Sequence, residues 1–234
     1  MLKIGLIVAH DHKAQGAVSF HNKNPYTENI WSKEVLDECA NILTTPNFQA
    51  IVVRRGVGMN YDEINDVYKS LGGVDLSLEL HFNSFHSATA RGQEMLVYNV
   101  AEDIRIAKHI CEHLFNVAGI SRRRDKGAFI LNIGDRGSSN LSKVIYAKHK
   151  MLYEPAFGNH DTADSRYIFN TGKFASDLAE AIASAMDIDL SVDNSATIIK
   201  QLREKIQILN GIIDFKSKKV EEAMAMLEEA NEYK

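Results

Sequence analysis

The chain has 234 residues, of which 45% are hydrophobic and 25% charged, and its formal net charge is −4. This composition is typical of a soluble globular protein. The acidic balance argues against a nucleic-acid-binding protein, which usually carries a basic face. No apolar run approaches the roughly 20 residues of a membrane-spanning helix. The sequence therefore predicts neither a nucleic-acid partner nor insertion into a membrane.

The N-terminal stretch MLKIGLIVAHDHK does not have the features of a secretory signal peptide. Its apolar run is short, and charged and histidine residues stand where the cleavage region would be. We therefore expect the chain to be synthesised in the cytoplasm. Action outside the cell would then depend on another component for export or release.

Short apolar runs alternate with helical patterns over the first 186 residues. The helical patterns have recognisable ends, since Thr27 is a suitable N-cap and Gly72 and Gly73 can close the second pattern. We expect the last helix to be weakened at Gly172. In chain order, the sequence predicts a strand at residues 4–9, a helix at 27–43, a strand at 50–54, a helix at 61–71, strands at 74–80 and 94–98, a helix at 102–117, strands at 129–132 and 150–154, and a helix at 165–186.

Apolar strands that alternate with helices predict an α/β fold, with a mostly parallel twisted sheet and helices on both faces. In such sheets, ligands bind beyond the carboxyl ends of the strands. His10 and His81 directly follow predicted strands, and Glu154 ends one. We therefore expect these three side chains to lie at one edge of the sheet.

The composition changes after Met186, and three segments are expected: a main domain at residues 1–188, a polar linker at 189–197 and a coiled-coil-like helical segment at 198–234. A heptad pattern in the last segment favours a homo-oligomer formed through this helix. Gly211 and the polar Lys216 weaken its middle, so an antiparallel hairpin is an alternative, as is a single helix docked on the main domain. The apolar seam consists of Ile199, Leu202, Ile206, Leu209, Ile213, Val220, Ala223, Leu227 and Ala230.

Two histidines and two glutamates form a candidate metal site. Zinc in hydrolases commonly takes three protein ligands and leaves a position for water, whose pKa it lowers towards about 7. His10, His81 and Glu28, which begins the first helix, are the candidate ligands, and Glu154 is the candidate proton shuttle. Each glutamate has a structural alternative. Glu28 suits the helix dipole as a first-turn residue, and Glu154 could belong to a buried ion pair.

The order of these residues resembles that of type 3 zinc-dependent N-acetylmuramoyl-L-alanine amidases, which include bacterial cell-wall enzymes and phage endolysins. LIVAHDHKAQGA supplies His10 and the family's Gly-Ala pair, and YTENIWSKEV supplies Glu28. ELHFNS supplies His81 and Asn83, and RGQEMLVY matches a Gly-x-Glu that opens the next strand. LYEPAFGNHDTAD supplies Glu154. The blocks occur in the family's order across residues 1–186.

The resemblance implies that residues 1–188 are a zinc amidase domain, in which His10, Glu28 and His81 hold Zn²⁺ and Glu154 is catalytic. The implied reaction hydrolyses the amide between the lactyl group of N-acetylmuramic acid and L-alanine in peptidoglycan. The implied setting is phage or prophage lysis, with action on the cell wall after release. Two alternatives remain: a catalytically inactive wall-binding or phage-assembly protein, and a zinc peptidase that cuts another peptidoglycan bond.

The sequence also departs from the family's pattern. Ala9, Asp11 and His12 replace the glycines beside the first histidine, so His12 could compete for the metal. Glu79 replaces the usual serine. Because Glu79 alternates with His81 along a strand, we expect both to face one side and Glu79 to accept from an imidazole N–H.

Two polar features near these blocks have open interpretations. Asn83 either orients substrate or satisfies a turn. The basic run SRRRDK at residues 121–126 is expected to be a solvated loop, with contact to wall carboxylates or teichoic phosphates as the alternative.

Overall fold

The computed structural model describes residues 1–20, 26–58 and 60–191. Residues Met1–Ser191 form one compact unit. The predicted coiled-coil segment at 198–234, and most of the predicted linker, lie outside the described residues.

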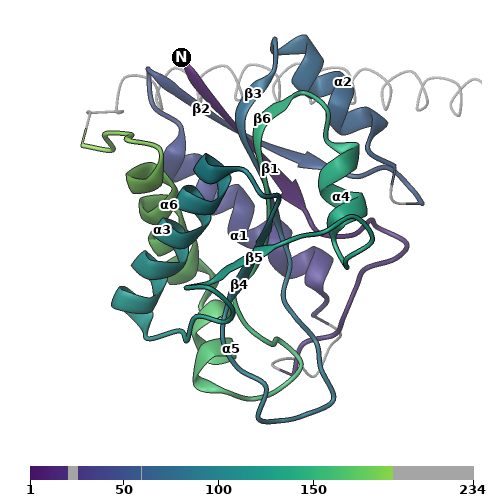
Figure 1. Cartoon of the computed structure of the whole chain (residues 1–234), viewed down its shortest axis with the longest axis vertical. Helices are drawn as coiled ribbons and strands as arrows, with labels where there is room; N and C mark the ends of the chain where they lie inside the picture. Colours follow the sequence, from purple (N-terminus) through teal and green to yellow (C-terminus); the bar gives the residue numbers. More distant parts are fainter. Residues whose placement is uncertain (21–25, 59, 192–234) are drawn as a thin grey trace, which may run out of the picture. The chain divides into compact units, whose positions relative to one another are not determined.

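A six-stranded sheet forms the centre of the described chain, with the strand order β2-β1-β3-β6-β4-β5 (Figure 1). The first four strands in this order are parallel, and β4 pairs antiparallel with β6. The predicted mostly parallel sheet is therefore confirmed. The strands are β1 (Leu2–Val8), β2 (Phe48–Arg54), β3 (Val74–Leu80), β4 (Glu94–Val97), β5 (Ala128–Ile130) and β6 (Ala147–Glu154).

Helices cover both faces of this sheet, as the sequence predicts (Figure 1). The alternation of side chains along β1 shows the division, since Ile4, Leu6 and Val8 belong to one buried cluster and Ile7 to another. The first cluster contains residues of α1, α3 and α6, and the second contains residues of α2. The helices are α1 (Glu28–Leu43), α2 (Asp62–Ser70), α3 (Ala101–Ala118), α4 (Ser138–Lys143), α5 (Ala163–Ile168) and α6 (Thr171–Ala185).

The predicted helix at residues 165–186 is wrong in one respect, because the chain forms two helices there. The break lies at Phe169 and Asn170, where Asn170 has non-helical backbone angles, and Gly172 lies within α6. The break has a packing reason. It lets the Phe169 ring join Trp31 and Phe82, at centroid distances of 6.2 and 5.8 Å. Aromatic burial thus decides the chain direction at this point.

α4 is not predicted by the sequence. This helix has the sequence SSNLSK and only six residues. Such a short and polar segment has no apolar periodicity to detect, and its helical state depends on tertiary contacts. No helix among the described residues is long and apolar enough to cross a membrane.

The reversed direction of β4 adds a residue to the edge at which the parallel strands end. In the register of β4 and β6, Glu94 lies opposite Glu154. Glu94 is the first residue of its strand and Glu154 is the last of its own. The carboxyl ends of β1, β3 and β6 and the start of β4 therefore share one edge.

Candidate metal and catalytic site

The first turn of α1 is fastened to the end of β1. The Thr27 side chain caps the helix by accepting from the Ile30 N–H. The Asn29 side-chain amide donates to the Ala9 carbonyl at 2.7 Å, and the Ala9 N–H donates to the Ser32 hydroxyl at 3.1 Å. These bonds hold the start of the helix beside the residue that precedes His10. They place Glu28, the first residue of α1, at the edge of the sheet.

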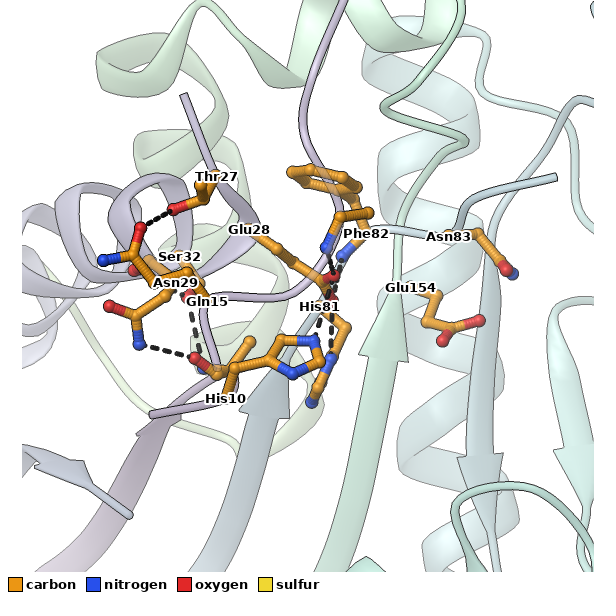
Figure 2. Close-up of polar contacts among 12 residues, drawn as sticks. His10, Gln15, Thr27, Glu28, Asn29, Ser32, His81, Phe82, Asn83 and Glu154 are labelled. Atoms are coloured by element: carbon orange, nitrogen blue, oxygen red, sulfur yellow. Dashed lines mark hydrogen bonds and ion pairs between the residues drawn. The ribbon is translucent and has the colours of Figure 1, made fainter. Parts of the chain in front are cut away.

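The Glu28 carboxylate lies between the imidazoles of His10 and His81 (Figure 2). Its Oε2 is 3.0 Å from His10 Nε2, and its Oε1 is 2.6 Å from His81 Nδ1. One ligand atom from each of the three residues lies within 4.8 Å of the other two. Two imidazole nitrogens and a carboxylate oxygen at this spacing are a donor set that fits zinc.

Backbone amides complete the surroundings of Glu28. The Ala17 N–H donates to Oε2 at 3.2 Å, and the Phe82 N–H donates to Oε1 at 3.3 Å. Burial by itself raises the pKa of the Glu28 carboxyl, but the charges and hydrogen bonds of His81 and His10 outweigh burial and lower this pKa to about 2. The carboxylate is therefore ionised at neutral pH and available as a ligand.

His81 has a carboxylate at each ring nitrogen. Nδ1 faces Glu28, and Nε2 lies 2.8 Å from Oε1 of Glu79. Burial lowers the pKa of His81, but the charge and hydrogen bond of Glu28, followed by those of Glu79, raise it to about 10. The predicted position of Glu79, on the same side of the strand as His81, matches this geometry.

Glu79 is held in turn by a buried polar network. The Tyr61 hydroxyl donates to Oε2 at 2.8 Å, and the Asn140 amide donates to Oε1 at 3.3 Å. Arg55, whose side chain is completely buried, places Nη2 3.2 Å from Oε1. Burial alone raises the pKa of Glu79, but the hydrogen bond and charge of His81 and the charge of Arg55 lower it. Glu79 is thus an ionised group directly behind His81.

The altered turn after β1 is stabilised by its own side chain. The Asp11 carboxylate accepts from the N–H groups of Lys13 and Ala14 at 2.7 and 2.8 Å, and from that of Gly58 at 3.1 Å. His10 itself adopts a left-handed backbone with φ of 59°. The turn therefore brings His10 to Glu28 without the glycines that the family has beside this histidine.

Gly16 is the position in this loop where a side chain cannot fit. Its φ is +78°, and an added Cβ would lie 2.4 Å from His10 Cδ2 and 2.7 Å from Glu28 Oε2. Both the backbone angle and the space favour glycine. The Gly-Ala pair in the sequence thus lies directly against two of the candidate ligands.

His12 and Asn83, two further candidate residues, have different surroundings. His12 is exposed and lies outside the ligand group of the described chain, and its carbonyl accepts from the Gln15 amide. Asn83 is buried. Its side-chain amide donates to Glu94 at 2.8 Å, and its backbone N–H donates to the Ala156 carbonyl at 2.8 Å. Asn83 thus satisfies a turn and also contacts the Glu94 carboxylate at the edge of the sheet.

Glu154 lines a cleft of about 350 Å³ together with His10, Glu28 and His81. Its Oε1 accepts from Arg136 Nη2 at 3.0 Å. Burial raises the pKa of the Glu154 carboxyl, and although the charges of Arg136 and His81 oppose burial, the pKa reaches about 7. A carboxyl with this pKa can both accept and donate a proton at neutral pH.

Arg55, Arg136 and Asn140 also line this cleft, although the sequence did not predict them as site residues. Arg55 had a detectable signal, because it directly follows β2, and the rule that selected His10 applies to this strand end as well. Arg136 lies in the loop before α4, and Asn140 lies within α4. No pattern marks either position, since the sequence does not predict α4.

A comparison with protein families decides the assignment. The family model of N-acetylmuramoyl-L-alanine amidases (Amidase_3) matches residues 4–187. The chain belongs to the N-acetylmuramoyl-L-alanine amidase family. The matched range includes all four residues of the candidate site. The predicted enzyme class is confirmed: the chain is an amidase of this type, and its substrate class is peptidoglycan.

Solved amidase structures share the fold of this amidase. The structure described as an N-acetylmuramoyl-L-alanine amidase from Neisseria meningitidis is 22% identical, with a TM-score of 0.63 over 80% of this chain and 97% of that one. The catalytic domain of CwlV, from Bacillus (Paenibacillus) polymyxa var. colistinus, is 17% identical, with a TM-score of 0.61 over 81% and 100%. The catalytic domain of the CD27L endolysin, which targets Clostridia difficile, is 20% identical, with a TM-score of 0.59 over 79% and 98%. No curated protein sequence matches the chain.

Proposed function

We propose that this amidase is a zinc-dependent hydrolase that cuts the amide between the lactyl group of N-acetylmuramic acid and L-alanine. In this proposal His10, Glu28 and His81 are the metal ligands, and Glu154 is the proton shuttle. The observation that carries the proposal is the meeting of these three donors, with Glu154 in the wall of the same cleft.

The two ring nitrogens of His81 have different partners. A bound zinc ion would supply a polarised water and a Lewis acid for the amide carbonyl. The Nε2–H of His81 donates to Glu79, and Nδ1–H donates to the Glu28 carboxylate, so a bound zinc ion would take the place of the Nδ1 proton. Tyr61 and Arg55 keep Glu79 in this position and in its charged form. The buried network behind His81 thus orients a ligand.

Glu154 performs the proton transfers in this mechanism. As a carboxylate it accepts a proton from the attacking water, whose oxygen adds to the amide carbon. It then donates this proton to the leaving nitrogen of L-alanine as the C–N bond breaks. Without this donation the tetrahedral adduct would collapse back to the amide. A pKa of about 7 suits both steps, and Arg136 holds the carboxylate through Oε1.

We further infer that the amidase is a phage or prophage lysin, and that the segment at residues 198–234 joins copies of the chain. The first statement is supported by the fold shared with the catalytic domain of the CD27L endolysin, and the second by the heptad pattern of the sequence. Light scattering of the full chain and of residues 1–191 tests the second statement. A monomeric full chain would contradict it.

Two measurements on the purified protein test the proposed reaction. We expect about one zinc per chain by elemental mass spectrometry, because the described residues supply one set of three protein ligands. Digestion of purified cell walls should release stem peptides with a free L-alanine amino group. Cuts between stem residues would instead assign the protein to the zinc peptidases. A folded, metal-free chain that clears no wall suspension after zinc addition would indicate a protein that only binds walls.

A further inference from the structure

A second cleft, of about 510 Å³, adjoins the catalytic one. The two clefts share Ser84, Leu96, Arg136 and Glu154 as lining residues. The second cleft therefore begins at the group that would meet the leaving amine. None of the candidate metal ligands lines it, so its lining is suited to binding rather than to metal chemistry.

Arginine dominates the charge of this second cleft. Its lining contains four guanidinium groups and two carboxylates, those of Glu94 and Glu154. Asp164, which pairs with Arg91, brings the balance to four guanidinium groups and three carboxylates. The cleft is therefore a positively charged site in a chain whose net charge is −4. The four arginines are Arg91, Arg123, Arg124 and Arg136.

Aromatic rings and a buried carboxylate hold three of these arginines in place. The Arg123 guanidinium lies 5.0 Å from the ring centre of Phe157, and that of Arg124 lies 4.5 Å from the ring centre of Phe129. Arg91 binds the buried carboxylate of Asp164 through Nη2 at 2.6 Å and Nε at 3.3 Å. Side chains that are already ordered lose less entropy when they bind a ligand.

Arg124 has the most binding capacity left among these three. It is about half exposed, and its contact with Glu94 is a single long one, 3.4 Å from Nε. A guanidinium has five N–H donors, so most of those of Arg124 are available to a ligand. Its backbone is left-handed, with φ of 55°. Such angles are unusual for a residue other than glycine and often mark functional positions.

We propose that this arginine cleft binds free carboxylate groups of the peptidoglycan stem peptide, on the leaving-amine side of the cut bond. The inference rests on the proposed function, because that function defines the bond. The sugar side of the substrate has its lactyl carboxyl tied up in the amide, whereas the peptide carries carboxylates at its acidic residues and at its end. Arginine binds carboxylates in a bidentate manner, and phenylalanine rings suit the peptide's apolar groups.

The shared wall of the two clefts agrees with this arrangement. Each peptide residue spans at most about 3.3–3.6 Å, so the residues that follow L-alanine reach beyond Glu154 into the adjoining cleft. The basic loop therefore contributes two of its arginines to the site. Arg122, the first arginine of the run, does not line the cleft. It stacks on Phe115 at 4.5 Å and lies 3.4 Å from Glu112.

Arg122 provides a matched control for a binding experiment. Calorimetry would compare a synthetic muramoyl peptide that has free carboxylates with the same peptide fully amidated. The host is the full chain with Glu154→Gln, which slows turnover. We expect the free peptide to bind about tenfold tighter, the size of one charge-assisted hydrogen bond. Adding Arg124→Gln should remove most of this preference, Arg124→Lys should keep part of it, and Arg122→Gln should keep it all.

The binding readout separates this inference from the proposed function. A chain that cuts no wall bond but keeps the carboxylate preference would contradict the proposed function alone. Equal binding of the two peptides, or equal losses in Arg124→Gln and Arg122→Gln, would overturn the inference. The inference would also be overturned if a glycerol-phosphate polymer bound through Arg124 and the two peptides bound equally. The cleft would then bind wall phosphates.

Discussion

The two clefts that meet at Glu154 are built in opposite ways. In the catalytic cleft, Glu28, Glu79 and Arg55 are buried, and each charge depends on another buried charge. In the arginine cleft, Arg136 is largely exposed, and Arg124 is about half exposed and rests on the Phe129 ring and a single long contact with Glu94. Buried charges that lose a partner are costly, whereas exposed ones are screened by water. Changes in the first cleft should therefore affect folding and metal binding, whereas changes at Arg124, which lines only the second cleft, should affect substrate preference.

The largest expected effect is the loss of turnover when Glu154 is replaced, because this change should remove proton transfer and leave metal binding intact. Glu154→Gln should lower turnover on purified walls by about 10²–10⁴-fold, because the proton shuttle is lost. Its zinc content should stay at the wild-type level. His10→Ala, which removes a candidate ligand, should lose both activity and zinc. Elemental mass spectrometry and release of free L-alanine amino groups measure the two properties. A Glu154→Gln variant that lost its zinc would show that Glu154 is a ligand.

The next effect concerns the network behind His81. Glu79→Ser restores the residue that the family usually has, yet it leaves Arg55 as an unpaired buried charge. We expect the free energy of unfolding to fall by about 3–5 kcal/mol, as measured by urea denaturation of the metal-free protein. Adding Arg55→Met should recover part of the loss, because the uncompensated charge is then gone. Equal stability of Glu79→Ser and the wild type would show that Glu79 is not coupled to Arg55.

A smaller effect depends on pH and follows from the raised pKa of Glu154. The pKa is about 7 in the folded chain, against an ordinary value of 4.5, so the folded state holds this proton more tightly. The wild type therefore loses stability as pH rises from about 4.5 to 7. Gln cannot ionise and avoids this loss. The metal-free Glu154→Gln variant should be more stable than the wild type at pH 8, by on the order of 1–3 kcal/mol.

The same experiment contains its own control, because the advantage of Glu154→Gln should disappear below about pH 3.5, where the wild-type carboxyl is protonated in both states. Thermal melts across this range measure the difference. An advantage that did not change with pH would mean that packing, rather than ionisation, distinguishes the two side chains.

The smallest effect in the catalytic cleft tests the space around Gly16. Gly16→Ala places a methyl group against His10 and Glu28, so we expect zinc affinity to fall by about tenfold. Gly58→Ala is the matched control, since its φ is +76° and an added Cβ would meet nothing within 4 Å. Gly58→Ala should introduce backbone strain alone and should keep the wild-type zinc affinity. Competition with a zinc chelator measures both, and equal affinities would indicate that the loop moves to accept the methyl group.

The sequence predicted the main features of the site for reasons that are local. Apolar runs identified β1, β3 and β6, and His10, His81 and Glu154 lie at their ends because parallel strands share one carboxyl edge. The alternation of residues along β3 placed Glu79 on the side of His81. Chain order and residue type were enough for these inferences, and they were also enough for the family resemblance.

Only the tertiary structure decided what surrounds those residues. Arg55 reaches Glu79 from another strand, and Arg136 reaches Glu154 from a loop that no pattern predicts. Glu94 lies at the edge because β4 runs in the reverse direction. A pKa depends on burial and on nearby charges, and these come from segments far apart in the chain. The sequence by itself therefore determined which groups could act, and the packing of distant segments decided their charges, their partners and the cleft beside them.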